Sequence, residues 1–171
     1  MKLIKLPADP LQTFGNDYSI HKRTINGILA SYNSNYDILS EIIQNSIDAI
    51  EDAISIYPDE TQSIVVSINL RDNRLSVLDS GIGMSAEECV SAFAPHISFK
   101  DDERRAKYKT KYRGLKGVGL TFISYGTNLI NIHSRKDGSV FSGKMVFACD
   151  WVRGKTQSPP EIVDDKMHSN L

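Results

Sequence analysis

The chain has 171 residues, of which 24% are charged and 40% hydrophobic, and its net charge is −1. This length allows one domain with a buried core, and the balanced charge gives no general reason to expect binding to nucleic acid or to an anionic membrane. No stretch approaches the roughly 20 apolar residues of a membrane span. The two cysteines, Cys89 and Cys149, lie far apart, which favours buried reduced thiols over a disulfide or a zinc site. We therefore expect a soluble, cytoplasmic protein.

The chain divides into three parts by composition. Residues 1–18 carry prolines, a glycine and an Asn–Asp turn signal, and they are expected to form an irregular or strand-forming arm. Residues 19–154 contain all the regular patterns and are expected to form the folded domain. Residues 155–171, with Pro159, Pro160 and a run of acids, are expected to be a linker or a disordered tail.

Hydrophobic periodicity predicts helices and hairpins in alternation within the domain. In chain order, the first expected elements are a helix over 19–31 with Ser19 as its cap, a helix capped by Asn35 or Asp37 that reaches about Tyr57, and a hairpin of 63–70 with 75–79. A short helix capped by Ser85, a long loop or lid over 95–113, a helix opened by the glycines of 114–119 that runs through Thr121–Ser124, and a hairpin of 128–135 with 139–151 follow. This order predicts an α+β fold, a two-layer α/β sandwich with helices on one face of a mixed, mainly antiparallel sheet.

The second helix carries the first candidate site. Glu41, Asn45 and Asp48 stand at i, i+4 and i+7 and therefore share one face. An asparagine oxygen suits Mg²⁺, which prefers oxygen ligands, and a glutamate can take a proton from an attacking water. The alternative is that these residues are only the solvated side of an amphipathic helix.

The second candidate is the turn after the first hairpin. Asp79 ends a strand and is followed by Gly81 and Gly83, which let the backbone pass close to a flat ligand. The Asp79 carboxylate could accept a hydrogen bond from an exocyclic amine such as that of adenine, and Met84 could pack against the ring. An ordinary strand-to-helix turn is the alternative, because Asp-Ser-Gly is a common turn sequence.

The third candidate is the glycine loop Gly114-Leu115-Lys116-Gly117-Val118-Gly119, which leads into a helix. Free backbone N–H groups and the positive end of the helix dipole attract anions at such a position. The spacing is neither that of a Walker A loop nor that of a Rossmann dinucleotide loop. A flexible hinge before a helix is the alternative.

Taken together, the ExxxNSxDA, DSGIGMS and GLKGVG motifs, in this order and spacing over residues 20–150, resemble the GHKL ATPase superfamily of gyrase-type topoisomerases, heat-shock ninety-kilodalton chaperones, histidine kinases and MutL-like mismatch-repair proteins. The resemblance implies the Bergerat fold, and ATP and Mg²⁺ as ligands. By this resemblance, Glu41 activates the water, Asn45 holds Mg²⁺, and Asp79 reads adenine. The other residues that it assigns to the nucleotide site are Asp48, Gly81, Gly83, Met84, Gly114, Lys116, Gly117, Val118 and Gly119.

A glutamate at position 41 resembles the hydrolysing branches of the superfamily, so ATP hydrolysis is the expected activity. Histidine-kinase-like phosphotransfer is the first alternative, although His21 is the only histidine before Glu41 and no long helical hairpin surrounds it. A nucleotide-gated interaction module without turnover is the second. The resemblance also implies further domains or a partner protein and an ATP-dependent homodimer, in which the arm could exchange between protomers.

The lid is rich in lysine, arginine and tyrosine, interrupted by Asp101, Asp102 and Glu103. A basic stretch with interleaved aromatic residues can contact nucleic acid. It can equally close over the phosphates of ATP or remain solvated. Contact with nucleic acid is therefore kept as an open possibility of the sequence.

Overall fold

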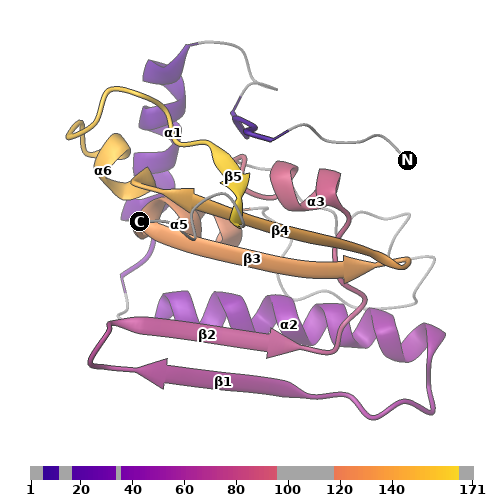
Figure 1. Cartoon of the computed structure of the whole chain (residues 1–171). Coiled ribbons are helices and arrows are strands. Elements are labelled where there is room, and N and C mark those ends of the chain that lie inside the picture. Colours follow the sequence, from indigo (N-terminus) through magenta and orange to yellow (C-terminus); the bar gives the residue numbers. More distant parts are fainter. Residues whose placement is uncertain (1–5, 12–16, 34–35, 96–117, 166–171) are drawn as a thin grey trace.

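The computed structural model of the chain describes residues 6–11, 17–33, 36–95 and 118–165 (Figure 1). Within them lie ten labelled elements. They are α1 (Tyr18–Ala30), α2 (Asp37–Ile56), β1 (Ile64–Asn69), β2 (Arg74–Asp79), α3 (Ala86–Ser91), α5 (Gly119–Gly126), β3 (Leu129–Lys136), β4 (Ser139–Val146), α6 (Ala148–Val152) and β5 (Ile162–Asp164). None of the described helices is both long enough and apolar enough to cross a membrane.

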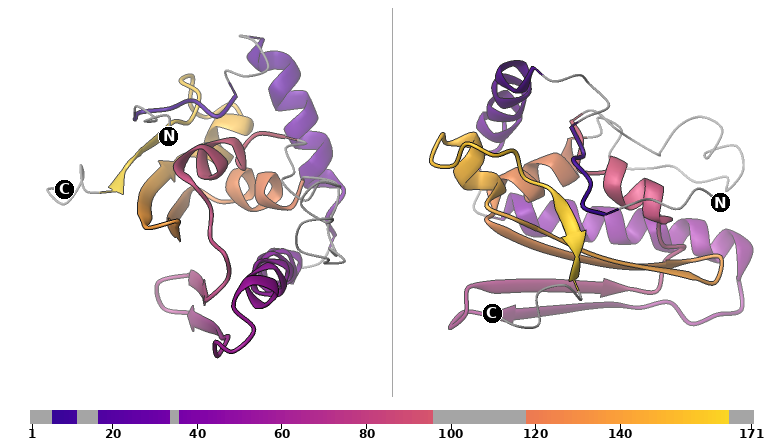
Figure 2. Two further views of the ribbon diagram at one scale, coloured as in Figure 1. Left: turned by 90° about the vertical axis from the view of Figure 1, so that its right-hand side faces the viewer. Right: turned by 45° about the horizontal axis from the view of Figure 1, so that its top comes forward.

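The predicted α+β class is confirmed, with every described strand pairing antiparallel. β1 pairs with β2 in one ladder, and β3, β4 and β5 pair in that order in another. The strands lie to one side of the molecule, with α1, α2 and α5 on the other (Figure 2). Helices therefore cover one face of each ladder, which gives the predicted two-layer arrangement.

The first helix begins one residue earlier than the sequence pattern predicted. Asp17, rather than Ser19, is its cap, because an Asp17 carboxylate oxygen accepts hydrogen bonds from the backbone N–H groups of Ser19 and Ile20 at 3.0 and 3.4 Å and from the Ser19 hydroxyl at 2.6 Å. These bonds lower the pKa of Asp17, the Ser19 hydroxyl contributing most. The predicted arm therefore ends at Asp17, and its boundary with the helix is set by this carboxylate.

The face of α2 that carries Glu41, Asn45 and Asp48 is covered in part by the rest of the domain. Asp48 is buried, and Glu41 and Asn45 are half-buried. The isoleucines from Ile38 to Ile50 are half-buried as well, whereas Ile54 and Ile56 near the helix end are 44% and 42% exposed. The burial of Asp48 contradicts the alternative that this face is only solvated.

The second hairpin is shorter than predicted. β4 ends at Val146, and residues 148–151, predicted to continue the strand, lie in α6. Phe147 takes a left-handed conformation with φ of 60°, which breaks the strand, and its N–H donates to the Asn128 carbonyl at 2.8 Å. The Asn128 side chain then accepts from the Asp150 N–H at 3.0 Å. The strand is therefore stopped by contacts with a residue 19 positions earlier.

The expectation of a linker or disordered tail from residue 155 is wrong for residues 162–164. They form β5, which pairs with β4 through Met145 and Ile162, and the Ile162 side chain is fully buried. Ile162 also exchanges backbone hydrogen bonds of 2.8 and 3.0 Å with Ala8. Ala8, a residue of the predicted arm, is thus hydrogen-bonded to the last strand of the same chain. A strand of three residues is too short for its periodicity to be visible in the sequence.

The main core lies between α1, α5, α6 and the ladder of β3, β4 and β5. Its buried members include Leu11, Phe93, Tyr125, Met145, Trp151 and Ile162. The Trp151 ring meets the Tyr18 ring edge-on with centroids 6.0 Å apart. Cys89 and Cys149 are free and buried, as expected from their spacing.

Replacing Ile162 by Ala tests whether the end of the domain belongs to the core. Loss of a fully buried isoleucine side chain is expected to lower the free energy of unfolding by roughly 2–5 kcal/mol. Urea denaturation followed by circular dichroism measures it. The matched control is Val163→Ala on the partly buried neighbour, with an expected loss of about 1 kcal/mol or less. Equal losses in the two variants would show that β5 adds no core.

Candidate functional site

The site is built on the contact between the middle of α2 and the end of β2. The Asp79 carboxylate accepts two hydrogen bonds, one from the Ser46 hydroxyl at 2.9 Å and one from the Gly81 N–H at 3.0 Å. The Ile82 N–H donates to the Ala49 carbonyl at 3.0 Å. The strand end and the turn after it are therefore held directly against the helix that carries Glu41 and Asn45.

Gly81 is required by this contact. A Cβ at this position would lie 2.6 Å from the Ala49 Cβ and 2.9 Å from a carboxylate oxygen of Asp79. Both distances are shorter than real Cβ contacts, so any side chain would push the turn away from α2. The absence of a side chain therefore allows the close approach on which the position of Asp79 depends.

Gly83 attaches the same turn to β3. Its φ of +70° favours glycine, and a Cβ there would collide with the Arg135 carbonyl oxygen. The next residue, Met84, donates its N–H to the Ser134 hydroxyl at 2.7 Å, and its side chain packs against the hydrophobic core. Residues 81–84 thus join the two ladders, with α2 on one side and β3 on the other.

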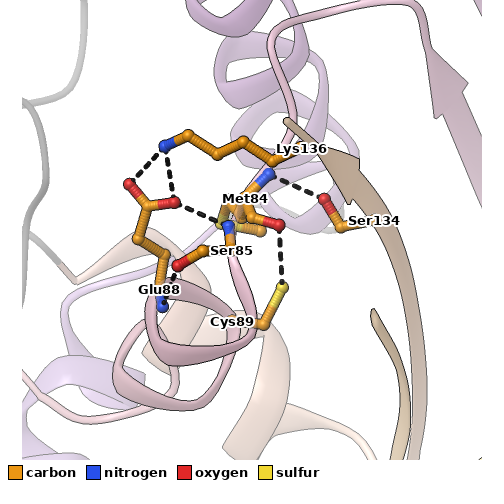
Figure 3. Close-up of polar contacts among 6 residues, drawn as sticks. All are labelled: Met84, Ser85, Glu88, Cys89, Ser134 and Lys136. Atoms are coloured by element: carbon orange, nitrogen blue, oxygen red, sulfur yellow. Dashed lines mark hydrogen bonds and ion pairs between the residues drawn. The ribbon is translucent and has the colours of Figure 1, made fainter. Parts of the chain in front are cut away.

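An ion pair between Lys136 and Glu88 lies at the end of the turn (Figure 3). The Lys136 ammonium lies 2.7 Å from each carboxylate oxygen of Glu88, and both side chains are about 20% exposed. One of these oxygens also accepts from the Ser85 N–H at 2.7 Å, while the Ser85 hydroxyl accepts from the Glu88 N–H at 3.2 Å. Glu88 therefore completes the capping box of α3 and fixes α3 to β3 at the same time.

Cys89 lies beside this group without being reactive. Its Sγ is 3.9 Å from the Met84 carbonyl oxygen. Burial raises the pKa of the Cys89 thiol to about 12, so the thiol remains protonated near neutral pH and is not a nucleophile there.

The first residue of α5 lies against Glu41. A Cβ at Gly119 would collide with the Oε2 atom of Glu41, so glycine allows the start of this helix to approach the carboxylate. The other Glu41 oxygen, Oε1, accepts a hydrogen bond from the Tyr32 hydroxyl at 2.9 Å. The Thr121 hydroxyl donates to the Ala94 carbonyl at 3.2 Å, so the residues that precede and follow segment 96–117 meet at this position.

The structure brings together most of the residues that the sequence pointed to. Glu41, Asn45 and Asp48 lie on α2, and Asp48 is 1% exposed. Asp79, Gly81, Gly83 and Met84 lie in the turn held against it, and Val118 and Gly119 begin α5. Gly114, Lys116 and Gly117, and almost all of the predicted lid, lie outside the described residues.

Sequence reasoning missed three partners of the site. Ser46 lies within the ExxxNSxDA motif, next to Asn45, and its position there could have drawn attention to it. Tyr32 and Ser134 had no such signal, because they lie outside the motifs that they contact, Tyr32 nine positions before Glu41 and Ser134 fifty positions after Met84.

A helix that carries a glutamate, an asparagine and an aspartate, with a glycine turn held against it and antiparallel strands beside it, is the arrangement of a GHKL ATPase domain. Residues 32–160 match the family described as histidine kinase-, DNA gyrase B- and HSP90-like ATPases. The chain belongs to this family, and the resemblance inferred from the three motifs is confirmed.

Relatives within the superfamily include mismatch-repair proteins. Over 100 residues the chain is 26% identical to the DNA mismatch repair protein MutL of Bacillus anthracis, and the same figures hold for the MutL proteins of Bacillus cereus and Bacillus mycoides. The match covers 58% of this chain and 14% of each relative. The chain thus corresponds to a small part of the length of these proteins.

Replacing Lys136 by Met tests how firmly the turn is fixed to β3. The partly buried Glu88 carboxylate would lose its charged donor, and the free energy of unfolding is expected to fall by about 1–3 kcal/mol. Lys155→Met is the matched control, because Lys155 pairs with Asp150 at 3.0 Å but is 62% exposed. An exposed pair contributes at most about 1 kcal/mol. Urea denaturation of both variants gives the comparison, and equal losses would mean that Lys136 does no more than a surface lysine.

Proposed function

We propose that this chain binds ATP with Mg²⁺ and hydrolyses it slowly, as the ATP-binding part of a longer protein. The observation that carries the proposal is the Asp79 carboxylate. It is held by Ser46 and Gly81 at the end of β2, against the helix that also carries Glu41 and Asn45. Adenine recognition and phosphate chemistry would then be set at a fixed separation along one rigid helix.

Asp79 is suited to bind adenine. A carboxylate offers about four acceptor positions, so the two hydrogen bonds from Ser46 and Gly81 leave capacity for the exocyclic amine of the base. Gly81 and Gly83 keep the turn free of side chains beside that position. Membership of an ATPase family supports this choice of ligand.

The side chains of the site suit a Mg²⁺ ion that enters already bound to the phosphates of ATP. Among the described residues, no group of three or more His, Cys, Asp or Glu side chains could hold a metal ion by itself. Mg²⁺ in nucleotide sites keeps waters and phosphate oxygens as most of its ligands and needs only one or two protein oxygens. Asn45 would supply that oxygen, and the ion would neutralise phosphate charge. The proposed phosphate contacts are the residues of the glycine loop, namely Gly114, Lys116, Gly117, Val118 and Gly119. Asp48 is proposed to form part of the wall of the site.

Glu41 is the proposed general base. It would accept a proton from water as the water oxygen attacks the γ-phosphorus, while the bond from that phosphorus to the ADP oxygen breaks. The start of α5 next to Glu41 would place backbone N–H groups near the developing negative charge. The products would be ADP and inorganic phosphate.

The longer protein is proposed to form an ATP-dependent homodimer in the cytoplasm. The buried free thiols suit a reducing compartment. The relatives are named as DNA mismatch repair proteins, which supports a role near nucleic acid, and the basic residues of segment 95–113 would be the proposed contact.

Replacing Asp79 by Asn tests the adenine assignment. The variant loses a charged acceptor, so the dissociation constant for ATP with Mg²⁺ is expected to rise roughly tenfold to a hundredfold, the equivalent of one charge-assisted hydrogen bond. Isothermal titration calorimetry measures it.

The control for this variant is Asp59→Asn, at an exposed position after α2. It should bind ATP as the wild type does, and the circular dichroism of both variants should match the wild type. Unchanged affinity in the Asp79 variant would contradict adenine recognition by this residue.

Replacing Glu41 by Gln tests the base. ATP binding should persist, while the rate of phosphate release should fall by roughly a hundredfold or more, the usual contribution of general base catalysis. Glu87→Gln, on an exposed glutamate of α3, is the control. Wild-type turnover in the Glu41 variant would remove the base assignment.

The same assays separate the alternatives. Transfer of labelled γ-phosphate to a protein histidine would establish the kinase-like function; His21, the histidine upstream of Glu41, is only 6% exposed and is a poor acceptor. Binding of ATP by the wild-type chain without any phosphate release, even as a dimer, would establish a nucleotide-gated interaction module instead.

A further inference from the structure

Tyr32 makes a contact with Glu41 that none of the three motifs contains. It lies just after α1, where its N–H donates to the Leu29 carbonyl at 3.4 Å, and its side chain is partly buried. Its hydroxyl donates to the Oε1 atom of Glu41 at 2.9 Å, across nine positions of the sequence. The end of α1 thus reaches the candidate catalytic residue of α2.

The ring of Tyr32 is held in place by α5. It stacks on the Phe122 ring with centroids 3.8 Å apart and planes 9° from parallel. A tyrosine side chain has few rotatable bonds, so a stacked ring fixes the direction of its hydroxyl at little further entropic cost. The hydroxyl is therefore aimed at Glu41 of α2 by two elements, the end of α1 and α5.

In this hydrogen bond Tyr32 is the donor and Glu41 is the acceptor. Burial, together with the hydrogen bond to Glu41, raises the pKa of Tyr32 well above its ordinary value, so the phenol keeps its proton. A protonated phenol beside an ionised carboxylate acts as the donor. Oε1 accepts this hydrogen bond, while Oε2 lies at the start of α5, beside Gly119.

We infer that Tyr32 is a positioning residue for Glu41: its hydroxyl, stacked in place on Phe122, holds Oε1 and so leaves Oε2 as the atom that faces the attacking water. This inference rests on the proposed hydrolysis of ATP and assigns the two oxygens of Glu41 to separate tasks. A carboxylate free to rotate would present either oxygen, and misplacement of a base by a fraction of an ångström reduces turnover without weakening binding.

Tyr32→Phe tests the inference, since it keeps the stacked ring and removes only the hydroxyl. The rate constant kcat for phosphate release should fall roughly tenfold or more, the range expected for loss of an orienting partner, while KM and the calorimetric affinity for ATP should change by no more than about twofold. Tyr57→Phe, at the exposed end of α2, is the matched control and should leave both constants unchanged.

A second measurement needs neither nucleotide nor turnover. With glutamate labelled by ¹³C at the side-chain carboxyl, the Glu41 resonance is the one that disappears in Glu41→Gln. It should move in Tyr32→Phe at neutral pH, because the carboxylate has lost a donor, and stay in place in Tyr57→Phe. An unmoved Glu41 resonance together with wild-type kcat in Tyr32→Phe would overturn the inference.

Two different results would contradict ATP hydrolysis and the positioning role of Tyr32. A wild-type chain that releases no phosphate from ATP would refute hydrolysis, and the carboxyl resonance would still report whether Tyr32 holds Glu41. If the wild type hydrolyses ATP and Glu41→Gln does not, while Tyr32→Phe keeps full activity, then Glu41 is the base and Tyr32 has no part in positioning it.

Discussion

The contact between the end of β2 and the middle of α2 is the constraint on which the site depends. Asp79 is held by Ser46 of the helix and by Gly81 of the turn, and Gly81 approaches Ala49 too closely to carry a side chain. The same turn also lies against β3, where Gly83 approaches the Arg135 carbonyl too closely to carry a side chain. One short turn therefore determines how the first hairpin, the long helix and the second ladder lie relative to one another.

That contact also gives a buried polar group of α2 a partner. Burying a serine and two aspartates costs free energy unless their polar atoms find partners, and the Ser46 hydroxyl donates to the Asp79 carboxylate. In α2, Ser46, Asp48 and Asp52 are buried, whereas the isoleucines from Ile38 to Ile50 are half-buried. Buried polar groups of this kind are expected where function as well as stability selects the sequence.

The sequence was informative wherever a signal is local. The periodicity of α2, the alternation of both hairpins, and the Ser85 cap of α3 all depend on residues a few positions apart, and each is found in the structure. The first two motifs also lie side by side in the structure, because the turn after β2 packs directly on α2.

What could not be predicted depends on distant partners. α6 replaces part of a predicted strand because Phe147 and Asp150 bond to Asn128, and β5 exists because Ile162 fits between Met145 and Ala8. Tyr32 and Lys136 likewise act on residues in other elements. No local propensity encodes such pairs, since each residue would suit a loop or a surface equally well.

The hydrogen bond between Thr121 and Ala94 has an evolutionary consequence. It joins Ala94 and Thr121, which lie on either side of residues 96–117, so the chain before and after those residues is held together by the domain itself. The entropy of closing a chain on fixed ends grows only with the logarithm of its length. A change in the number of residues between these two positions would therefore cost little closing entropy. Related proteins could differ in length there while the residues around Glu41 and Asp79 stay as they are.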